Sequence, residues 1–203
     1  GLESDFGRFQ GNFNIITSLT SLAAGRRARY FRGELLEAIV LYEESNLQIE
    51  SFVGSWAGAI GQCQFMPWNV RKYGIDYDQN GIVDLKNSTS DALASMANFL
   101  RSLGWNDSFT WGRPVSLSDD IIEDSLLNGQ TTYSLKHWEE IGVRRINGDS
   151  LPDVVLEARL LRPKNSGGRI YLIYSNFDVI MKWNRSHYFA LTVGSFLNQL
   201  KNN

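Results

Sequence analysis

The sequence contains the stretch Gly54-Ser-Trp-Ala-Gly-Ala-Ile-Gly-Gln-Cys-Gln-Phe-Met-Pro67, in which three glycines and two alanines fall close together. Small residues at this density allow two backbones, or a backbone and a ligand, to approach closely. The pattern alone fits a tightly packed helix–helix contact as well as it fits a binding site. Pro67 is expected to end or redirect the segment, because proline cannot continue a helix interior.

Helical periodicity surrounds this stretch on both sides. Apolar residues recur every three to four positions in four segments, which predicts helices with one buried face. The predicted helices cover residues 12–24, 31–44, 91–103 and 186–201. The third of these is the clearest, since Asp91 lies at its positive N-terminal end and Gly104 follows it as a stop signal.

The later part of the chain carries a β signal. Residues 106–152 are polar and irregular, with short helical signals near 118–127 and 134–141. Two β-rich runs within about residues 154–174 flank the turn sequence Asn165-Ser-Gly-Gly168, which predicts a β-hairpin element. We therefore expect an α+β fold that is mostly α-helical.

Composition limits the classes of protein to which the chain can belong. The 203 residues are 43% hydrophobic and 21% charged, which excludes disordered, collagen-like and coiled-coil classes and favours a single domain over residues 1–203. The net charge of −2 argues against a general nucleic-acid binder, which needs a basic excess. No apolar run approaches the roughly 20 residues that span a bilayer.

An acidic loop is the first segment with recognisable chemistry. Asp76-Tyr-Asp-Gln-Asn-Gly-Ile-Val-Asp84 places oxygen side chains at relative positions 1, 3, 5 and 9 and glycine at position 6, as in the first half of an EF-hand calcium loop. Position 12 is Asn87 where glutamate is usual, and Asp91 could supply the closing carboxylate. The alternative is a polar turn in which Asp91 only begins a helix.

Two further candidates are ambiguous on their own. Cys63 is the only cysteine, so it forms no intramolecular disulfide, and it fits a small buried hydrophobe better than a nucleophile. No G-x-S-x-G nucleophile elbow is present. A single glutamate near a chain end, such as Glu3, is usually a solvated charge.

Taken together, several segments in chain order change this interpretation. They are Glu3-Ser-x-Phe-Gly7, Gly25-Arg-Arg-Ala-x-Tyr-Phe31, the Gly54–Pro67 stretch, the Asp76–Asp84 loop, Ser95-Met-Ala-Asn98 with Gly104-Trp105, Asn176-Phe177 and Trp183-Asn-Arg-Ser-His-Tyr188. This series resembles the catalytic domain of the membrane-bound lytic murein transglycosylase B family. The resemblance runs from residue 1 to about residue 200 and is weakest over 106–150.

The resemblance implies a lysozyme-like fold that acts on peptidoglycan. Such enzymes cleave the β-1,4 bond between N-acetylmuramic acid and N-acetylglucosamine and leave a 1,6-anhydro ring on the muramic acid. The catalytic glutamate of the family maps onto Glu3, which would act first as general acid and then as general base. Because the attacking hydroxyl belongs to the sugar itself, one carboxylate suffices where ordinary glycosidases need two.

The resemblance also implies a set of substrate-binding residues. These are Arg26, Arg27, Tyr30, Ser55, Gln64, Asn176, Asn184, Ser186 and Tyr188. The adjacent arginines also fit solvated charges at a helix end, and Ser186 also fits a helix cap. One departure from the family is Phe99, which stands where the family usually has tyrosine.

The implied metal is one structural calcium ion, and no organic cofactor is expected. Its ligands would come from the acidic loop and the following helix: Asp76, Asp78, Asn80, the Ile82 carbonyl, Asp84 and Asp91. A calcium sensor is a weaker alternative, since one such loop is visible and no methionine-rich groove accompanies it.

The expected partners are peptidoglycan glycan strands and proteins of cell-wall synthesis or remodelling, with no nucleic acid. The sequence carries no signal for oligomeric state. The implied location is the periplasm of a Gram-negative bacterium, and an outer-membrane anchor in sequence outside this chain is compatible with it. The chain opens at Gly1 without an initiator methionine or a signal-peptide pattern, and family members carry residues ahead of the catalytic glutamate. We therefore expect a portion of a longer protein.

Two other functions remain open on the sequence. One is a peptidoglycan-binding module of the same fold without turnover, which the early position of Glu3 and the lost hydroxyl at Phe99 suggest. The other is a lysozyme-type hydrolase, which would release reducing ends in place of anhydro ends.

Overall fold

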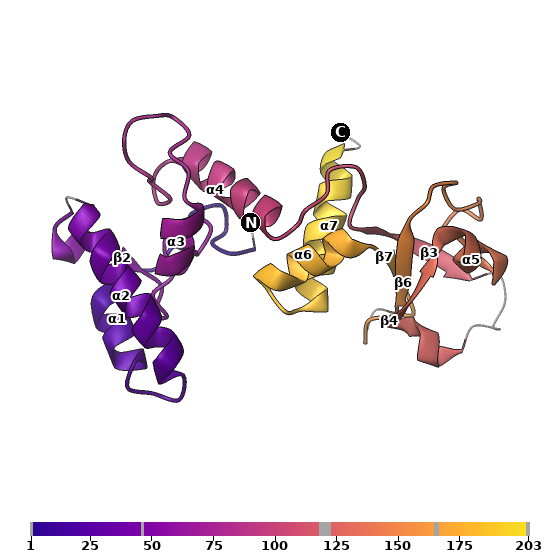
Figure 1. Cartoon of the computed structure of the whole chain (residues 1–203), viewed down its shortest axis with the longest axis horizontal. Coiled ribbons are helices and arrows are strands. Elements are labelled where there is room, and N and C mark those ends of the chain that lie inside the picture. The colour runs from indigo at the N-terminus through magenta and orange to yellow at the C-terminus, as the bar shows by residue number, and fades with distance from the viewer. Residues whose placement is uncertain (1, 46, 118–122, 165–166, 202–203) are drawn as a thin grey trace. The chain divides into compact units, whose positions relative to one another are not determined.

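The chain folds into two compact units, Gly1–Ser102 and Leu103–Asn203, each described by itself below (Figure 1). The computed structural model describes residues 2–45, 47–117, 123–164 and 167–201. Ile15, Leu19, Ala38 and Phe52 form a core cluster in the first unit, whereas the second has core clusters of its own around Trp138 and Trp111. Apolar residues are thus buried in separate cores, and the assignment of residues 1–203 to one domain stays a prediction.

The first unit is mainly helical. Its elements are β1 (Phe13–Asn14), α1 (Ile15–Leu22), α2 (Ala28–Glu44), the 3₁₀ helix η1 (Ile49–Ser51), β2 (Val53–Gly54), α3 (Pro67–Tyr73) and α4 (Thr89–Ser102). The helix α1 begins after Asn14, whose side chain accepts a hydrogen bond from the Thr17 amide and so satisfies one free N–H of the first turn. The predicted helices at 12–24, 31–44 and 91–103 are confirmed within a few residues.

The Gly54–Pro67 stretch is a set of turns, not a helix. A Cβ on Gly54 would lie 2.2 Å from the Ala59 carbonyl oxygen, and one on Gly61 would lie 2.3 Å from the Leu85 carbonyl oxygen. These approaches leave room for glycine alone. Pro67 starts α3 at its first position, where its missing N–H costs nothing, so it begins a helix instead of ending one.

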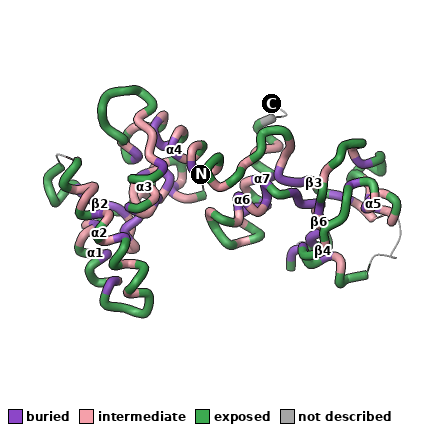
Figure 2. The backbone as a smooth tube through the Cα atoms, viewed as in Figure 1, coloured by how far each residue is buried: buried purple, intermediate pink, exposed green. Residues whose placement is uncertain are grey.

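The second unit combines an antiparallel sheet with helices. Its elements are β3 (Gly112–Leu117), the 3₁₀ helix η2 (Asp124–Leu127), β4 (Asn128–Ser134), α5 (Leu135–Glu140), β5 (Val143–Arg145), β6 (Glu157–Leu161), β7 (Ile170–Ile173), α6 (Ser175–Trp183) and α7 (His187–Lys201). The strand order in the sheet is β4-β6-β7-β3-β5. Figure 2 shows buried residues along β6 and β3, where Leu160 and Val115 belong to the core.

The predicted β-hairpin is confirmed, and it is part of a larger sheet. Strands β6 and β7 pair antiparallel with Leu160 opposite Leu172. The expectation that residues 106–152 are irregular is wrong, because β3, β4 and β5 lie within them. The helical signal at 134–141 corresponds to α5, whereas part of the one at 118–127 falls outside the described residues. Helix α6 was not predicted. Among the described residues, no helix is both long and apolar enough to cross a membrane.

Helix α7 depends on a glycine at its contact with the sheet. A Cβ on Gly194 would lie 2.3 Å from two ring atoms of the fully buried Trp111. We expect Gly194→Ala to lower the free energy of unfolding by about 1–3 kcal/mol, as overpacking of a filled core does. Urea unfolding of the chain measures this.

The matched control is Gly33→Ala, an exposed position inside α2 where a Cβ meets nothing within 4 Å. This substitution should leave stability unchanged or raise it by about 0.5–1 kcal/mol, because alanine is the better helix former. Equal effects of the two substitutions would contradict the packing argument.

Candidate active site and acidic loop

Glu3 lies in a turn that is anchored on the Gly54–Pro67 stretch. The adjacent Ser4 is buried, and its hydroxyl donates to the Gln62 carbonyl at 2.6 Å and accepts from the Gly7 amide at 3.0 Å. Glu3 itself is partly buried. Hydrogen bonds of Ser4 hold the turn that carries Glu3. The Glu3 carboxyl group is still exposed enough for a ligand to reach it.

Cys63 is close enough to Glu3 for their charges to interact. Burial raises the pKa of the Cys63 thiol to about 12, and the negative charge of Glu3 contributes to this rise. The side chain is fully buried. The interpretation of Cys63 as a small buried hydrophobe is therefore confirmed, because such a thiol is neither ionised nor accessible at neutral pH.

Two predicted substrate residues shape the turns of the stretch. The Ser55 hydroxyl accepts from the Ala59 amide at 3.0 Å, and the Gln64 side-chain amide donates to the Gly61 carbonyl at 2.9 Å and to the Gln10 carbonyl at 3.2 Å. Both side chains thus fix the loop from within. Trp56, which the sequence did not single out, is 67% exposed between them in the chain.

Three other predicted residues lie where α2 begins. The Arg27 guanidinium stacks over the Tyr30 ring at 4.4 Å, and Arg26 is exposed. Tyr30 is hydrogen-bonded to the buried carboxylate of Glu34. Glu34 also accepts from the Trp68 amide at 3.0 Å, so it joins α2 to the first turn of α3.

Glu34 is a buried carboxyl group beside the predicted site residue Tyr30, and the sequence analysis missed it. Burial raises its pKa above the ordinary value, an effect that the hydrogen bonds from Trp68 and Tyr30 oppose and the nearby charge of Glu37 reinforces. The available signal was the spacing of Tyr30 and Glu34, since residues four apart share a helix face. The contact with Trp68, far away in sequence, gave no such signal.

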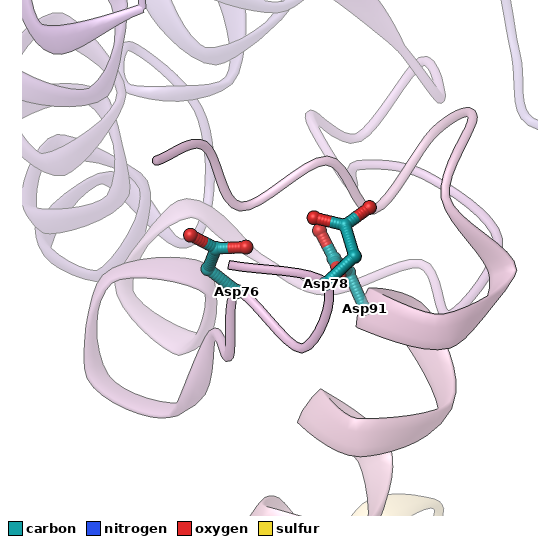
Figure 3. A group of neighbouring side chains, drawn as sticks. All are labelled: Asp76, Asp78 and Asp91. Carbon is teal, nitrogen blue, oxygen red and sulfur yellow. The ribbon is translucent and has the colours of Figure 1, made fainter. Parts of the chain in front are cut away.

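The acidic loop and α4 bring three carboxylates together (Figure 3). One oxygen each from Asp76, Asp78 and Asp91 lies within 4.8 Å of the others. Asp91 is fully buried and accepts from the Tyr77 amide at 3.0 Å and the Asp84 amide at 2.9 Å. Burial raises the pKa of Asp91, but these hydrogen bonds outweigh it and leave the pKa below its usual value, so the group is ionised at neutral pH.

The other predicted ligands are arranged differently. The Asp84 carboxylate accepts from the amides of Lys86 and Asn87, each at 2.9 Å, and is not part of the cluster. Asp84 therefore stays a predicted ligand that lies outside the cluster of three carboxylates. The Asn80 side chain accepts from the Ile82 amide at 2.9 Å, and both remain in the loop beside the cluster.

The four late residues belong to the second unit. Asn176 is buried, and its amide bonds the main chain of Asn106 and Phe109 at 2.8–2.9 Å. The Ser186 hydroxyl accepts from the Phe189 amide at 3.3 Å, so the helix-cap interpretation is confirmed. Asn184 is exposed, and the half-exposed Tyr188 donates its hydroxyl to the Lys164 carbonyl.

The comparisons with known proteins agree with this geometry. Residues 1–197 match the family model of the transglycosylase SLT domain. The chain belongs to this family. It is 30% identical over 201 residues to the membrane-bound lytic murein transglycosylase B of Escherichia coli K12, covering 95% of this chain and 52% of that protein. The chain thus spans about half the length of that relative.

Solved structures extend the similarity to the fold. SltB3 from Pseudomonas aeruginosa in complex with NAG-NAM-pentapeptide has a TM-score of 0.92 and 37% identity, over 100% of this chain and 55% of that chain. The E. coli lytic transglycosylase Slt35 in complex with calcium has a TM-score of 0.80 and 28% identity, over 96% and 61% of the two chains. The predicted family and the mostly helical, lysozyme-like α+β fold are confirmed.

The raised pKa of the buried Glu34 carboxyl group predicts that the stability of the protein depends on pH. This pKa is raised above the ordinary value of 4.5, so the folded protein holds this proton more tightly than the unfolded chain does. Stability from this group is therefore full below the ordinary value and falls as the pH rises through the raised pKa. Glu34→Gln cannot titrate, and we expect the wild type to gain stability relative to this variant when the pH is lowered from about 7 to about 4.

Urea unfolding at both pH values measures this difference. The control is Glu43→Gln, which removes an exposed acidic side chain of α2 and leaves Glu34 and Glu37 unchanged. It should leave the contribution of Glu34 intact. A wild type and a Glu34→Gln variant with parallel pH dependence would rule out a raised pKa for Glu34.

Proposed function

We propose that this chain is the catalytic portion of a peptidoglycan lytic transglycosylase, with Glu3 as its single general acid and base. The observation that carries the proposal is the anchored turn at Glu3. Its neighbour Ser4 is tied to Gln62 inside the stretch that most strongly resembles the family. The relative SltB3 is known in complex with NAG-NAM-pentapeptide and with NAG-anhNAM-pentapeptide, the second of which contains the anhydro sugar.

The reaction needs two proton transfers at one carboxyl group. Glu3 donates its proton to the glycosidic oxygen as the bond from that oxygen to C1 of the muramic acid breaks. The resulting carboxylate then takes the proton of the C6 hydroxyl, whose oxygen bonds to C1 and closes the anhydro ring. Glu3 ends protonated, as it began, and no water is consumed.

The neighbours of Glu3 suit this role. The Cys63 thiol, with its pKa near 12, stays neutral and adds no second negative charge beside the carboxylate. The glycan cleft would also use Arg26 and Arg27, which directly precede α2, and Tyr30 in its first turn. Ser55, Gln64 and the exposed Trp56 would line the cleft from the Gly54–Pro67 stretch. The Trp56 indole would offer a flat face to a sugar ring.

In the second unit, Asn184, Ser186 and Tyr188 are the proposed contacts to substrate. Asn176 contributes by holding the segment at Asn106. We place the protein in the periplasm of a Gram-negative bacterium, among cell-wall synthesis or remodelling proteins. The E. coli relative, a membrane-bound lytic murein transglycosylase, supports the cell-wall setting.

Digestion of purified murein tests the reaction. We expect the chain to release muropeptides with 1,6-anhydro ends, identified by mass spectrometry. Glu3→Gln should lower the rate by roughly 10²–10⁴, the range for loss of a general acid–base group. Glu50→Gln, which removes an exposed acidic side chain of η1, is the control and should keep the wild-type rate.

Three results contradict the proposal in different ways. Reducing ends in place of anhydro ends would indicate a lysozyme-type hydrolase. Murein binding without products would indicate a binding module. An unchanged rate in Glu3→Gln would remove Glu3 from the mechanism.

We further propose one structural calcium ion at the acidic loop. Three clustered carboxylates supply hard oxygen atoms of the kind calcium prefers, and Asp91 is held ionised by main-chain amides. Asn80 and the Ile82 carbonyl would complete the site. The relative Slt35 is known in complex with calcium, which supports this choice of ion.

Calcium should raise the melting temperature of the wild type by several degrees relative to a chelator, since a ligand at 100 times its Kd adds about 2.7 kcal/mol of stability. Asp78→Asn should abolish most of this rise, because Asp78 belongs to the cluster and is exposed enough to be replaced without loss of packing. Asp84→Asn should retain it, because the Asp84 carboxylate lies outside the cluster of three. A calcium response lost in Asp84→Asn and kept in Asp78→Asn would favour the ligand set expected from loop spacing alone.

A further inference from the structure

One face of helix α2 has no packing partner among the described residues. The helix packs on α1 and α3, and its buried residues Glu34 and Ala38 lie on that side. Leu36, which is 65% exposed, lies on the opposite face, and Ile39, which is 41% exposed, lies beside it. Two exposed apolar residues alone are ordinary for a protein surface, so the role of this face depends on its other residues.

Opposite charges lie at the two ends of this face. Arg29 and Glu43 are each seven residues from Leu36, so the three residues fall on nearly one line along the helix. Both charged side chains are exposed. They are about 21 Å apart along the axis at a rise of 1.5 Å per residue, too far to pair with each other. Among the described residues, neither forms an ion pair with any other part of the chain.

This order of charges opposes the dipole of α2. A helix favours acidic side chains in its first turn and basic ones in its last turn, yet the first turn of α2 has no acidic residue and its last turn no basic one. Arg29 lies in the first turn and Glu43 in the last. A second helix that runs antiparallel beside α2 brings its negative end to Arg29 and its positive end to Glu43, and thereby favours both charges.

Gly33 lies on the same face, and the packing of the first unit does not require it. Its φ is outside the left-handed region, and a Cβ there would meet nothing within 4 Å. Glycine in an exposed helix interior is also a poor helix former. The bare backbone at Gly33 instead leaves room for another helix to approach α2 closely at this point.

We propose that α2 forms the interface of a homodimer, in which the α2 helices of two copies pack antiparallel about a two-fold axis at Leu36. The axis places Leu36 on the partner's Leu36 and Arg29 beside the partner's Glu43, and it repeats this ion pair at the other end. The partner's Val40 lies over Gly33, where no side chain obstructs it. A two-fold interface needs a patch that is complementary to itself, and this patch meets the condition only in the antiparallel direction, which brings its basic end to its acidic end.

Charge reversal tests the direction and the register of the dimer. One helix face is smaller than the roughly 800 Å² per partner of a standard interface, so we expect a weak dimer with a Kd of roughly 10–100 µM in sedimentation equilibrium. Arg29→Glu and Glu43→Arg should each weaken it at least about tenfold, because each substitution places like charges together twice per dimer. The double variant Arg29→Glu/Glu43→Arg should return the Kd to within about threefold of the wild type. Both side chains are exposed, so all three variants should keep the wild-type melting temperature in dilute solution.

A disulfide at the two-fold axis tests the contact directly. Leu36→Cys should form a cross-linked dimer under mild oxidation, because the axis brings the two sulfur atoms within bonding reach. Cys63, the only native cysteine, is fully buried and does not compete. The matched control is Leu93→Cys on α4, where the leucine is 58% exposed, and this variant should remain monomeric.

The homodimer is contradicted by any of three outcomes. A wild type that stays monomeric up to about 1 mM would overturn the inference and leave this face to a different partner. A dimer that neither single charge variant weakens, or that the double variant does not restore, would use another surface or direction. Equal cross-linking of Leu36→Cys and Leu93→Cys would remove the axis from Leu36. None of the substituted residues is a proposed substrate contact, so these outcomes leave the proposed function to be decided by murein digestion.

Discussion

The close approach of main chain to main chain at Gly54 and Gly61 is the constraint on which the first unit depends. No side chain fits at either glycine, since a Cβ would meet a carbonyl oxygen at 2.2–2.3 Å. Because the chain can turn back on itself there, the Gln62 amide reaches the Leu85 carbonyl at 2.8 Å and the Gln62 carbonyl is presented to Ser4. This backbone arrangement holds the turn that carries Glu3, through the hydrogen bond from Ser4 to the Gln62 carbonyl.

Two buried carboxylates show how surroundings set the state of an acid in this protein. Burial dominates at Glu34 and raises its pKa, whereas several hydrogen bonds from main-chain amides and Ser88 lower the pKa of Asp91. The difference follows from the number of donors that face each group. Both carboxylates have a similar structural role. Glu34 links α2 to α3, and Asp91 links α4 to the acidic loop, each by accepting hydrogen bonds from main-chain amides.

Sequence reasoning succeeded where the deciding interactions are local. The helices follow from apolar spacing, and the family from segments whose order is fixed along the chain. It failed at β3, β4 and β5, which carry polar residues such as Arg113 and Ser116, so their pairing with distant strands left no local period. The ligand set of the acidic loop stays a prediction, because loop spacing gives the place of each carboxylate but not its orientation, which at Asp84 depends on hydrogen bonds from the amides of Lys86 and Asn87.

Gln62 connects the acidic loop to the turn that carries Glu3. Its main-chain amide bonds Leu85, its side-chain amide lies 3.4 Å from the Lys86 carbonyl, and its carbonyl holds Ser4. An ion that orders residues 76–91 would therefore stabilise the position of Glu3 through two hydrogen bonds and without touching substrate. In this arrangement the proposed metal would act on catalysis by geometry, because a general acid displaced by even 1 Å loses much of its effect.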